Sequence, residues 1–357
     1  MKILLFTLEY PPFRGGVANY YGNIVKYWPE HNNIIVLNNN SGGLISHKLP
    51  FLKWLPAVVR LRKCIIENKI DYVLAGHILP LGTASFILSL FMKFKYAVIM
   101  NGVDFTLSQK NFWKRFLSKI ILNKSDKIIC GNNFLSLEAK KNFEKKTFIF
   151  NPGIDIFDQV NGEFINRLKL KYKLTNKSVL LSVGRLVERK GFARVINLMP
   201  ELNKRIPNLV YVIVGNGPDY NKLSDQIKSQ QLNNIILIND ADDKERNAWL
   251  SLCDIFIMIS ENIKGDYEGF GIVYLEANSA GKPVIAGDSG GVRDAVIDNE
   301  TGLLVNPKND EEIINAVRKL SFDKELRDRL GQNGKLRALN QFEWSRHIND
   351  LYQILNI

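Results

Sequence analysis

Two glutamates eight residues apart carry the strongest chemical signal in this sequence. Glu268 precedes the turn Gly269-Phe270-Gly271, and Glu276 follows in a stretch with apolar residues on both sides. If that stretch is helical, eight residues rise about 12 Å, or roughly two turns. Carboxylates at that separation could take hydroxyl groups at opposite ends of a nucleotide sugar. An acid among apolar neighbours also needs a partner, so Glu276 is not expected to be an ordinary surface residue.

A basic loop elsewhere in the chain offers the opposite charge. Arg185 and Lys190 lie in GRLVERKGF, which follows an apolar run and leads into a helix-like segment. An arginine grips two phosphate oxygens at once, and a lysine adds a compact point charge. Free amide groups at a helix start after Gly271 would add to this attraction for an anion. A loop that merely carries solvated cations is the alternative.

Glycines mark two further places where a backbone could approach a ligand closely. Gly15 and Gly16 stand at a loop-to-helix entry after the first apolar run, although a plain turn explains them as well. Gly215, in VGNGP, follows another apolar run. This pattern begins like the GxGxxG fingerprint, but Tyr220 replaces the last glycine. The fingerprint also belongs after the first strand of a domain, whereas the run before Gly215 is the second, which excludes a dehydrogenase site of that type. A backbone contact to a nucleotide or sugar stays open.

Short, continuous apolar runs alternate with longer amphipathic segments along the chain. Such runs predict parallel strands that helices cover on both faces. Two series in succession predict two doubly wound α/β domains, with the break in the Pro-, Gly-, Asn- and Asp-rich stretch 151–164. Ligands of such sheets bind at the carboxyl ends of the strands, where the candidate residues stand. The predicted strands are 2–7, 33–37, 71–76, 96–100, 127–131, 147–150, 178–184, 209–215, 234–238, 254–260, 282–287 and 302–305.

The composition is that of an ordinary globular protein. The 357 residues, 46% of them hydrophobic and 24% charged, suffice for two domains with cores of their own. The three cysteines form no CxxC pair and the four histidines no HExxH motif, so neither a disulfide framework nor a zinc site is expected, and the cysteine usage fits a reducing cytosol. The start MKILLFTLEYPP is interrupted too early for a signal peptide, and the apolar stretch 79–92 is shorter than the ~18–20 residues of a membrane span.

The net charge of +12 is concentrated in one half of the chain. Residues 1–150 carry 21 Lys and Arg against 8 Asp and Glu, a net +13, whereas residues 151–357 carry 27 against 28, a net −1. A generally lysine-rich protein would not confine its charge in this way. We therefore expect an anionic partner for the N-terminal half, either nucleic acid or a membrane surface.

Several of these motifs occur together in a known family. The sequence resembles the retaining GT-B glycosyltransferases of the family-four kind in GRLVERKG, in the E-x7-E of EGFGIVYLE, in the glycine pair after the first strand and in GKPVIAGDSGGVRDAV. The stretch 268–291 looks most like the phosphatidylinositol mannosyltransferase branch. The resemblance spans nearly the whole chain and implies two Rossmann-like domains facing across a crevice. They would be an acceptor-binding domain over 1–160 and a nucleotide-sugar-binding domain over 161–335, with a C-terminal helix over 336–357 that could pack back on the N-terminal domain.

The same resemblance implies a role for each candidate residue. Arg185 and Lys190 would hold the diphosphate, Glu276 the ribose hydroxyls and Glu268 the transferred sugar, beside which His77 would lie. The implied catalytic residues are His77, Glu268, Arg185 and Lys190. The further donor contacts would be Gly16, Gly215, Gly269, Phe270, Gly271 and Ile272. The acceptor contacts would be Gly15, Asn19, Asn101 and Asp104, with Asn101 at a position where the family often has histidine.

The resemblance also implies chemistry without a metal or another cofactor. Asp240 and Asp242 fit the DxD pattern by which other glycosyltransferases bind manganese, but DKERNAWL follows, where Asp242 or Asp243 is better interpreted as a helix cap. Arg185, Lys190 and the helix amides would instead stabilise the departing diphosphate. Because no second carboxylate is evident as a nucleophile, the acceptor would attack on the face that the leaving group departs from, and the leaving phosphate would take its proton.

Two basic, aromatic segments favour a membrane surface over nucleic acid as the anionic partner. In 51–69 and 112–124, aromatic and aliphatic residues alternate with cations at helical spacing, as interfacial helices require. The alternative is that the apolar residues face the core while the cations are solvated. We expect a cytoplasmic protein peripherally associated with the inner face of the plasma membrane. The predicted membrane contacts are Lys53, Trp54, Arg60, Arg62, Lys63, Trp113, Lys114 and Arg115.

The favoured function is therefore transfer of a hexose, with mannose from GDP-mannose first, to a glycan or lipid-linked acceptor in cell-envelope polysaccharide or glycolipid synthesis. A UDP-sugar-dependent hexosyl- or N-acetylhexosaminyltransferase is the nearest alternative. A nucleotide-sugar epimerase of the same fold is another. A nucleic-acid-binding protein would use the basic half but would leave the acids and glycines of the second half unexplained.

Overall fold

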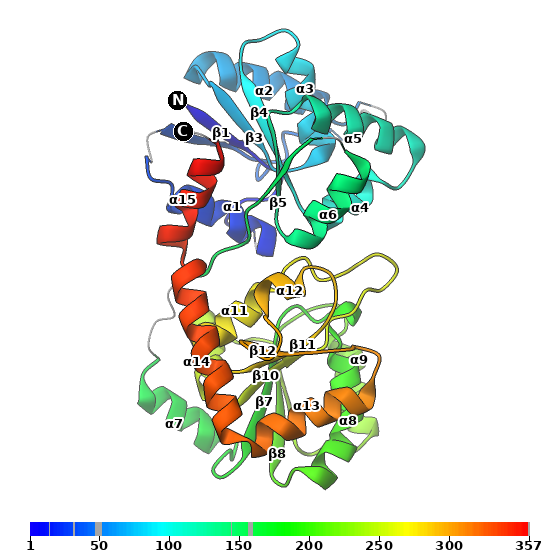
Figure 1. Ribbon diagram of the computed structural model, residues 1–357, viewed down its shortest axis with the longest axis vertical. Coiled ribbons are helices and arrows are strands. Elements are labelled where there is room, and N and C mark those ends of the chain that lie inside the picture. The colour runs from blue at the N-terminus through cyan, green and yellow to red at the C-terminus, as the bar shows by residue number, and fades with distance from the viewer. Residues whose placement is uncertain (14, 31–32, 47–51, 144, 156–159, 356–357) are drawn as a thin grey trace. The chain divides into compact units, whose positions relative to one another are not determined.

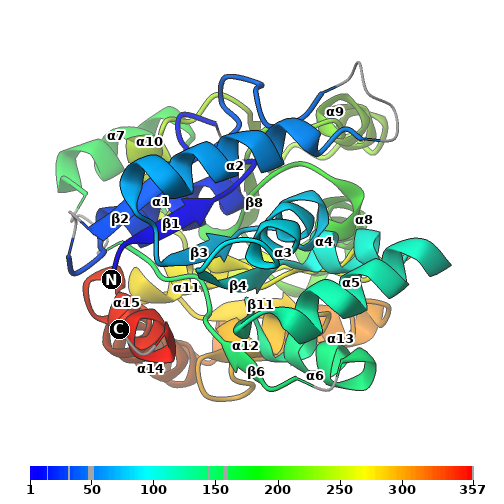
Figure 2. The same cartoon turned by 90° about the horizontal axis from the view of Figure 1, so that it is seen from above.

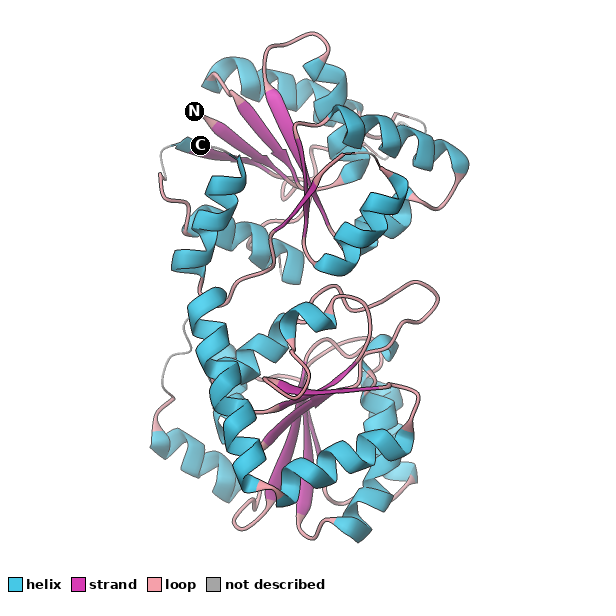
Figure 3. Cartoon of the chain, viewed as in Figure 1, coloured by secondary structure: helices cyan, strands magenta, loops and turns pink. Residues whose placement is uncertain are grey.

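The chain forms two compact units, each built around one parallel sheet (Figure 1). The structure, a computed structural model, describes residues 1–13, 15–30, 33–46, 52–143, 145–155 and 160–355. Unit 1 comprises Met1–Gly153 and Trp344–Ile357, and unit 2 comprises Ile154–Glu343. In both units the strands lie among helices, as Figure 3 shows. The prediction of two doubly wound α/β domains is confirmed.

The sheet of unit 1 has the strand order β2-β1-β3-β4-β5-β6. Strand β1 pairs in parallel with both β2 and β3, so the chain order reverses between β1 and β3. All six predicted strands of this half are present. Their bounds are β1 (Ile3–Phe6), β2 (Ile34–Leu37), β3 (Tyr72–Ala75), β4 (Lys95–Met100), β5 (Lys127–Cys130) and β6 (Thr147–Ile149).

The helices of unit 1 cover its sheet with apolar faces. Tyr20 and Tyr21 from α1, and Trp28 just after it, pack with Trp344 in an aromatic core on that sheet. Figure 2 shows α2, α3 and α5 following one another beside strands β1, β3 and β4. The bounds are α1 (Gly16–Lys26), α2 (Leu55–Asn68), α3 (Thr83–Ser89), α4 (Gly102–Ser108), α5 (Phe112–Lys124), α6 (Asn133–Asn142) and α15 (Trp344–Leu355).

The sheet of unit 2 has the strand order β12-β11-β10-β7-β8-β9. Strands β7, β8, β10 and β11 are almost wholly buried, which explains why they are continuous apolar runs instead of alternating ones. All six predicted strands are again present. Their bounds are β7 (Ser178–Val183), β8 (Leu209–Val214), β9 (Ile235–Ile238), β10 (Ile255–Met258), β11 (Val284–Gly287) and β12 (Gly302–Val305).

Side-chain caps begin several helices of unit 2. Asn161, Asp242 and Asn309 each accept a backbone N–H of the first turn, which satisfies a donor that the helix itself leaves free. The bounds are α7 (Gly162–Lys171), α8 (Phe192–Arg205), α9 (Tyr220–Ser229), α10 (Asp243–Leu252), α11 (Ile272–Ser279), α12 (Val292–Ala295), α13 (Asp310–Phe322) and α14 (Lys324–Gln341).

The chain passes between the units at residues 153/154 and 343/344. The sequence analysis had instead placed the boundaries after residues 160 and 335. Part of the expected break, 156–159, lies outside the described residues. The C-terminal segment is not one helix over 336–357, because α14 continues to Gln341 and α15 begins at Trp344. The Trp344 ring lies 5.9 Å from that of Tyr20 and 6.5 Å from that of Tyr27, centroid to centroid. These contacts make α15 part of the unit 1 core.

Candidate active site

The candidate residues of unit 2 follow two neighbouring strands at its topological switch point. Strand β7 pairs with β8 on one side and β10 on the other, so the chain order reverses between β7 and β10. In doubly wound sheets the carboxyl ends at such a point form the ligand crevice. Lys190 follows β7 and Glu268 follows β10. The two loops are tied together, since the Glu261 N–H donates to the Arg189 carbonyl at 2.9 Å.

Glu268 is 6% exposed and gathers three donors on one carboxylate oxygen. Its Oε2 lies 2.5 Å from Lys190 Nζ and 2.9 Å from Arg189 Nη1. The Ser260 hydroxyl donates to the same oxygen at 3.3 Å. The other oxygen, Oε1, has no hydrogen bond or ion pair with any residue that the structure describes. Oε1 is therefore the atom of this carboxylate that a ligand hydroxyl could reach.

The charge state of Glu268 follows from its surroundings. Burial acts to raise the pKa of its carboxyl, but the charges of Lys190 and Arg189 and their hydrogen bonds outweigh burial, so the pKa lies below its ordinary value. The group is thus ionised at neutral pH and accepts hydrogen bonds without donating them. Sequence reasoning selected Glu268 and Lys190 but missed Arg189, although it stands next to Lys190 in the turn Glu188–Lys190.

Two glycines allow the loops of this site to pack closely. Gly191 has φ +74°, and a Cβ there would lie 2.1 Å from the Ile259 carbonyl oxygen. A Cβ at Gly215 would lie 1.9 Å from the Gly184 carbonyl oxygen. Both positions therefore exclude a side chain. For Gly215, packing against Gly184 accounts for the glycine, and any contact with a donor would involve its backbone.

The Gly269–Gly271 turn leads into α11 with a left-handed residue. Gly271 has φ +80° and precedes the helix, and a Cβ there would meet the Tyr274 ring. Phe270 is buried with its ring 5.9 Å from that of Phe342, so its side chain belongs to the core. A Cβ on Gly269 would meet nothing within 4 Å. The main chain of this turn, with half-buried Ile272 after it, is what could face an anion.

Glu276 has the partner that its apolar neighbours led us to expect. It lies on α11, half-buried, and its two oxygens are 3.0 and 3.1 Å from Arg246 Nη1. Arg246 comes from α10, where its Nε also lies 3.9 Å from the Asp243 carboxylate. Sequence reasoning missed Arg246, because only the packing of α10 beside α11 brings it to Glu276.

Arg185 differs from Lys190 in its surroundings. Its side chain is exposed and makes no ion pair or hydrogen bond within the described part of the chain, whereas Lys190 is buried against Glu268. A cation without a protein partner is available to an incoming anion at no cost in broken contacts. Of the two predicted phosphate contacts, only Arg185 is thus unengaged.

The DxD-like acids are placed as the sequence analysis expected. Asp242 caps α10, with its carboxylate accepting the Glu245 N–H at 2.7 Å. Asp240 is exposed in the loop after β9. Across the described residues, no group of three or more His, Cys, Asp or Glu side chains is arranged to hold a metal ion.

In unit 1 the predicted residues also gather around a switch point, the one between β1 and β3. Gly15 and Gly16 begin α1 after the loop that follows β1, and a Cβ on Gly16 would meet nothing within 4 Å. Asn19, one turn later, is exposed. His77 follows β3 after Gly76. These residues therefore lie at the carboxyl edge of the sheet, as predicted.

His77 is held neutral inside this edge. Burial lowers the pKa of its imidazole to about 4, and its Nδ1 is buried with no hydrogen-bond partner among the described residues. Asp104, on α4, is buried and accepts the Ile78 N–H at 2.6 Å. Burial raises the pKa of Asp104 to about 7, although hydrogen bonds from the Ile78 and Leu79 amides act in the opposite direction. The carboxylate thus holds the backbone next to His77. Its predicted contact with an acceptor stays a prediction.

Asn101 is engaged in a short chain of hydrogen bonds. Its amide donates to the Tyr21 hydroxyl at 3.1 Å, and that hydroxyl donates to the Gly76 carbonyl at 2.6 Å. Tyr21 is fully buried on α1, and sequence reasoning did not select it. The amide therefore links α1, β3 and the loop after β4 beside His77.

The predicted membrane contacts fall into two groups. On and before α2, the cations Lys53, Arg60, Arg62 and Lys63 are exposed. Trp54 is half-buried and Leu61 is buried, while Leu55, Val59 and Ile66 of the same helix are exposed. On α5, Trp113 is 76% exposed and lies with Phe112 and Phe116 in a cluster of exposed rings, flanked by exposed Arg115 and half-buried Lys114. In the described residues no helix is long and apolar enough to cross a membrane.

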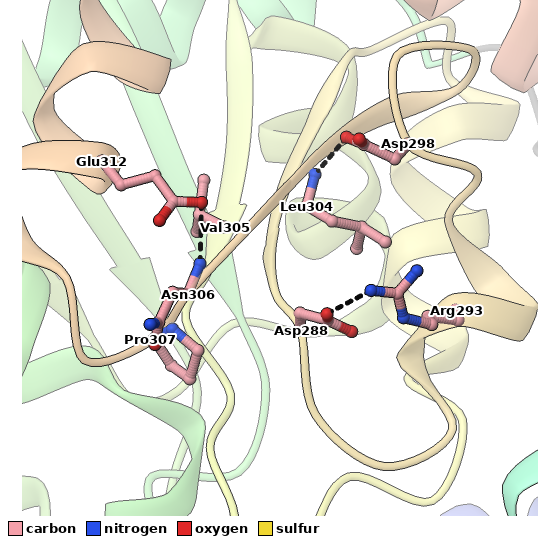
Figure 4. Close-up of a pocket in the computed structure, with 8 residues that line it drawn as sticks. All are labelled: Asp288, Arg293, Asp298, Leu304, Val305, Asn306, Pro307 and Glu312. Atoms are coloured by element: carbon pink, nitrogen blue, oxygen red, sulfur yellow. Dashed lines mark hydrogen bonds and ion pairs between the residues drawn. The ribbon is translucent and has the colours of Figure 1, made fainter.

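A separate pocket lies at the carboxyl ends of β11 and β12 (Figure 4). Each charged group that lines it has a partner: Arg293 pairs with Asp288, Glu312 accepts the Asn306 N–H, and Asp298 accepts the Leu304 N–H. None of the predicted site residues lines it. We therefore place the candidate site at β7 and β10 and leave this pocket outside it.

The chain is similar in sequence to known glycosyltransferases. Residues 166–337 match the family described as glycosyl transferases group 1. Over 367 aligned residues the chain is 26% identical to the GDP-mannose-dependent alpha-(1-6)-phosphatidylinositol monomannoside mannosyltransferase of Mycobacterium tuberculosis, covering 96% of this chain and 95% of that protein. Residues 166–337 thus form a glycosyltransferase domain of group 1 within unit 2. The matched region of this glycosyltransferase contains both glutamates, Arg185 and Lys190.

The fold of the glycosyltransferase is that of solved GT-B proteins. It resembles sucrose-phosphate synthase from Thermosynechococcus elongatus with a TM-score of 0.81 at 18% identity, covering 100% of this chain and 98% of that one. It also resembles Anabaena HepE, solved in complex with UDP, with a TM-score of 0.80 at 19% identity and full coverage of both chains. The predicted family and fold class are confirmed.

Proposed function

We propose that this glycosyltransferase transfers a hexose from a nucleoside-diphosphate sugar bound by unit 2 to a glycan or lipid-linked acceptor bound by unit 1. The observation that carries the proposal is the buried Glu268 carboxylate, clamped by Lys190 and Arg189 at the β7/β10 switch point inside the family match. There an ionised carboxylate lies beside two cations, and the Gly269–Gly271 turn follows it directly in the chain. This combination suits a sugar hydroxyl on one side and a diphosphate on the other.

Mannose from GDP-mannose is the favoured donor. Its support is the name of the M. tuberculosis relative, which aligns over nearly the full length of both chains. A UDP-linked hexose or N-acetylhexosamine is the second candidate, supported by the UDP bound to Anabaena HepE. In either case Glu276 would hold the ribose hydroxyls, with Arg246 keeping its carboxylate oriented.

In the proposed mechanism the bond from the sugar to the β-phosphate breaks with retention of configuration. Negative charge grows on the departing diphosphate, and Arg185, Lys190 and the amides before α11 stabilise it. The acceptor hydroxyl attacks on the face from which the diphosphate leaves and gives its proton to that phosphate. With a pKa of about 4, His77 is neutral and could hydrogen-bond a sugar hydroxyl without adding charge. Arg185 and Lys190 supply the positive charge that a metal would otherwise bring, so we propose that no metal is needed.

Donor binding in EDTA tests the donor and the metal independence together. Because a ligand that binds only the folded state raises stability by mass action, GDP-mannose at about 100 times its Kd should add about 2.7 kcal/mol and raise the melting temperature. We expect this shift in EDTA with GDP-mannose, and a smaller one with UDP-glucose. The measurement is a thermal-shift series over both nucleotide sugars, with and without added manganese. A shift seen only with manganese would overturn the metal-free proposal and direct attention to Asp240 and Asp242.

Product analysis separates the reaction classes. In EDTA the bound nucleotide sugar should yield nucleoside diphosphate only when an acceptor is added. Epimerised donor without any transfer would identify an epimerase of the same fold instead. Salt-sensitive DNA binding at micromolar Kd, without any donor shift, would favour the nucleic-acid-binding alternative.

We also propose that unit 1 docks on an anionic membrane through the beginning of α5. The exposed Phe112 ring lies 5.9 Å from the exposed Trp113 ring and 6.4 Å from the exposed Phe116 ring, centroid to centroid. Arg115 and Lys114 lie on the same turns. Aromatic residues beside cations suit the headgroup region, and each cation near an anionic surface contributes about 1 kcal/mol. The basic excess of residues 1–150 supports the choice of an anionic surface.

Vesicle binding tests this docking surface. We expect sedimentation with phosphatidylserine-containing vesicles but not with phosphatidylcholine vesicles, and weakening by salt. Phe112→Ser with Trp113→Ser should lower vesicle affinity at least about tenfold, whereas Leu170→Ser, an equally exposed apolar residue on α7, should not. Charge reversal of Lys53, Arg60, Arg62 and Lys63 measures the share of α2. No sedimentation at low salt would contradict the proposal and leave a soluble acceptor.

A further inference from the structure

Arg189 joins the two loops of the candidate site but is not among the cations proposed to hold the diphosphate. Its side chain is 22% exposed and contacts two carboxylates. Its Nη1 is 2.9 Å from Glu268 Oε2, and its Nε is 3.1 Å from Asp266 Oδ1. The Asp266 backbone is itself fixed, because Asp266 and Ile263 exchange two N–H to carbonyl hydrogen bonds of 2.9 Å. Arg189 is thus anchored on one side while it grips Glu268 on the other.

We propose that Arg189 is a positioning residue, anchored by Asp266, which holds Glu268 by Oε2 and so leaves Oε1 directed to a hydroxyl of the transferred sugar. This inference rests on the proposed function, in which Glu268 contacts that sugar. The inference explains how the Glu268 carboxylate keeps Oε2 bound to the protein and Oε1 available to the substrate.

Lys190 alone would not suffice for this task. A lysine ammonium is a compact point charge on a flexible stem, whereas the planar guanidinium of Arg189 is held at Nε by Asp266 and presents Nη1 to Oε2 from one direction. In the proposed mechanism Lys190 also faces the diphosphate, so its hold on Glu268 is shared when donor is bound. Arg189 and the Ser260 hydroxyl then keep Oε2 in place. The charged and titratable groups around Glu268 are Lys190 and Arg189 from the turn after β7, Asp266 behind Arg189, and Tyr274 on α11.

A double-mutant cycle on ligand affinity tests the inference. Calorimetry with GDP-mannose and with GDP should show that Arg189→Ala weakens GDP-mannose binding about 10- to 100-fold, since a carboxylate displaced by about 1 Å loses its hydrogen-bond geometry. GDP lacks the sugar, so its Kd should change by less than about twofold. In the Glu268→Ala background, Arg189→Ala should weaken GDP-mannose binding no further, because the residue acts through Glu268. Where the thermal-shift series favours UDP, UDP-glucose and UDP are the probes.

Arg205→Ala is the matched control. Arg205 also pairs with two carboxylates, those of Glu201 and Glu311, but at the end of α8 outside the site. It should leave both affinities unchanged. Arg189→Lys keeps the charge without the fork and should lie between wild type and Arg189→Ala.

Three outcomes would overturn the inference. Arg189→Ala could weaken GDP as much as GDP-mannose, its effect could add to that of Glu268→Ala, or it could have no effect. If Arg189→Ala does not fold, Asp266→Ala decides, because Asp266 is largely exposed and only anchors Arg189. It should weaken GDP-mannose binding about three- to tenfold, and no change would overturn the inference. Unchanged GDP-mannose binding in Glu268→Ala would instead reject the proposed site itself.

Discussion

Arg185→Ala is expected to lower sugar transfer at least about a hundredfold and to weaken binding of the bare nucleoside diphosphate. Arg185 is exposed and has no partner in the described structure, so its charge is directed to the diphosphate alone in the proposed site. Removing one preorganised donor from a developing negative charge typically costs 10²- to 10³-fold in turnover. The measurements are initial transfer rates and the Kd of GDP by calorimetry.

Folding should be little affected by this change, because the side chain is exposed and makes no hydrogen bond or ion pair with the residues that the structure describes. Arg329→Ala is the matched control, since Arg329 is another exposed arginine of this unit, on α14. It should retain the wild-type rate and GDP affinity. An Arg185→Ala variant with wild-type GDP affinity would mean that the loop after β7 does not hold the diphosphate.

The fold could be predicted because both sheets are parallel and covered on both faces. In that arrangement each strand is a continuous apolar run, as in LVYVIV of β8, and helices separate the runs. All twelve strands were therefore visible in the sequence. Helix α5 was visible too, since the apolar and basic residues of Phe112–Lys124 repeat at helical spacing. The cap at Asp242 followed from a short polar residue placed just before a helical pattern.

The partners of the two glutamates could not be predicted. Arg246 reaches Glu276 from α10, 30 residues away in the sequence, and nothing in the local pattern links the two. The buried position of Asp104 was hidden for the same reason, because its carboxylate meets the Ile78 amide only after β3 and β4 pair. Motifs reveal which residue types are available, whereas the packing of elements decides which of them meet.

The exposed face of a helix is another property that depended on packing. Both α2 and α5 combine cations with large apolar residues, and their sequences alone suggested the same surface. In the structure both helices divide their apolar residues: Leu61 of α2 and Ile121 of α5 are buried, whereas Val59 of α2 and Trp113 of α5 are exposed. The helices differ in that the exposed rings of α5 lie beside one another, Phe112 with Trp113 and with Phe116.

Glu276→Ala is expected to lower transfer about a hundredfold and to weaken GDP binding by a similar factor. The carboxylate, half-buried and paired with Arg246, is proposed to accept the ribose hydroxyls. A hydrogen bond to a charged group contributes about 1.5–3 kcal/mol, and each 1.4 kcal/mol is tenfold in affinity, so two such bonds account for this loss. Because the ribose is part of both GDP and the nucleotide sugar, the two affinities should fall together. In contrast, Glu268→Ala should affect only the sugar-bearing ligand.

Glu276→Gln separates the effect of the negative charge of the Glu276 side chain from the effect of its shape. The amide still offers one oxygen to a ribose hydroxyl but no longer forms an ion pair with Arg246, so its GDP affinity should lie between those of wild type and Glu276→Ala. Glu201→Ala removes an arginine-paired glutamate on α8 and serves as the control. The Glu276–Arg246 pair is partly exposed and contributes at most about 1 kcal/mol to folding, so the melting temperature should change little. Wild-type GDP affinity in Glu276→Ala would show that the ribose binds elsewhere and would leave Arg246 and Glu276 as an ion pair between α10 and α11.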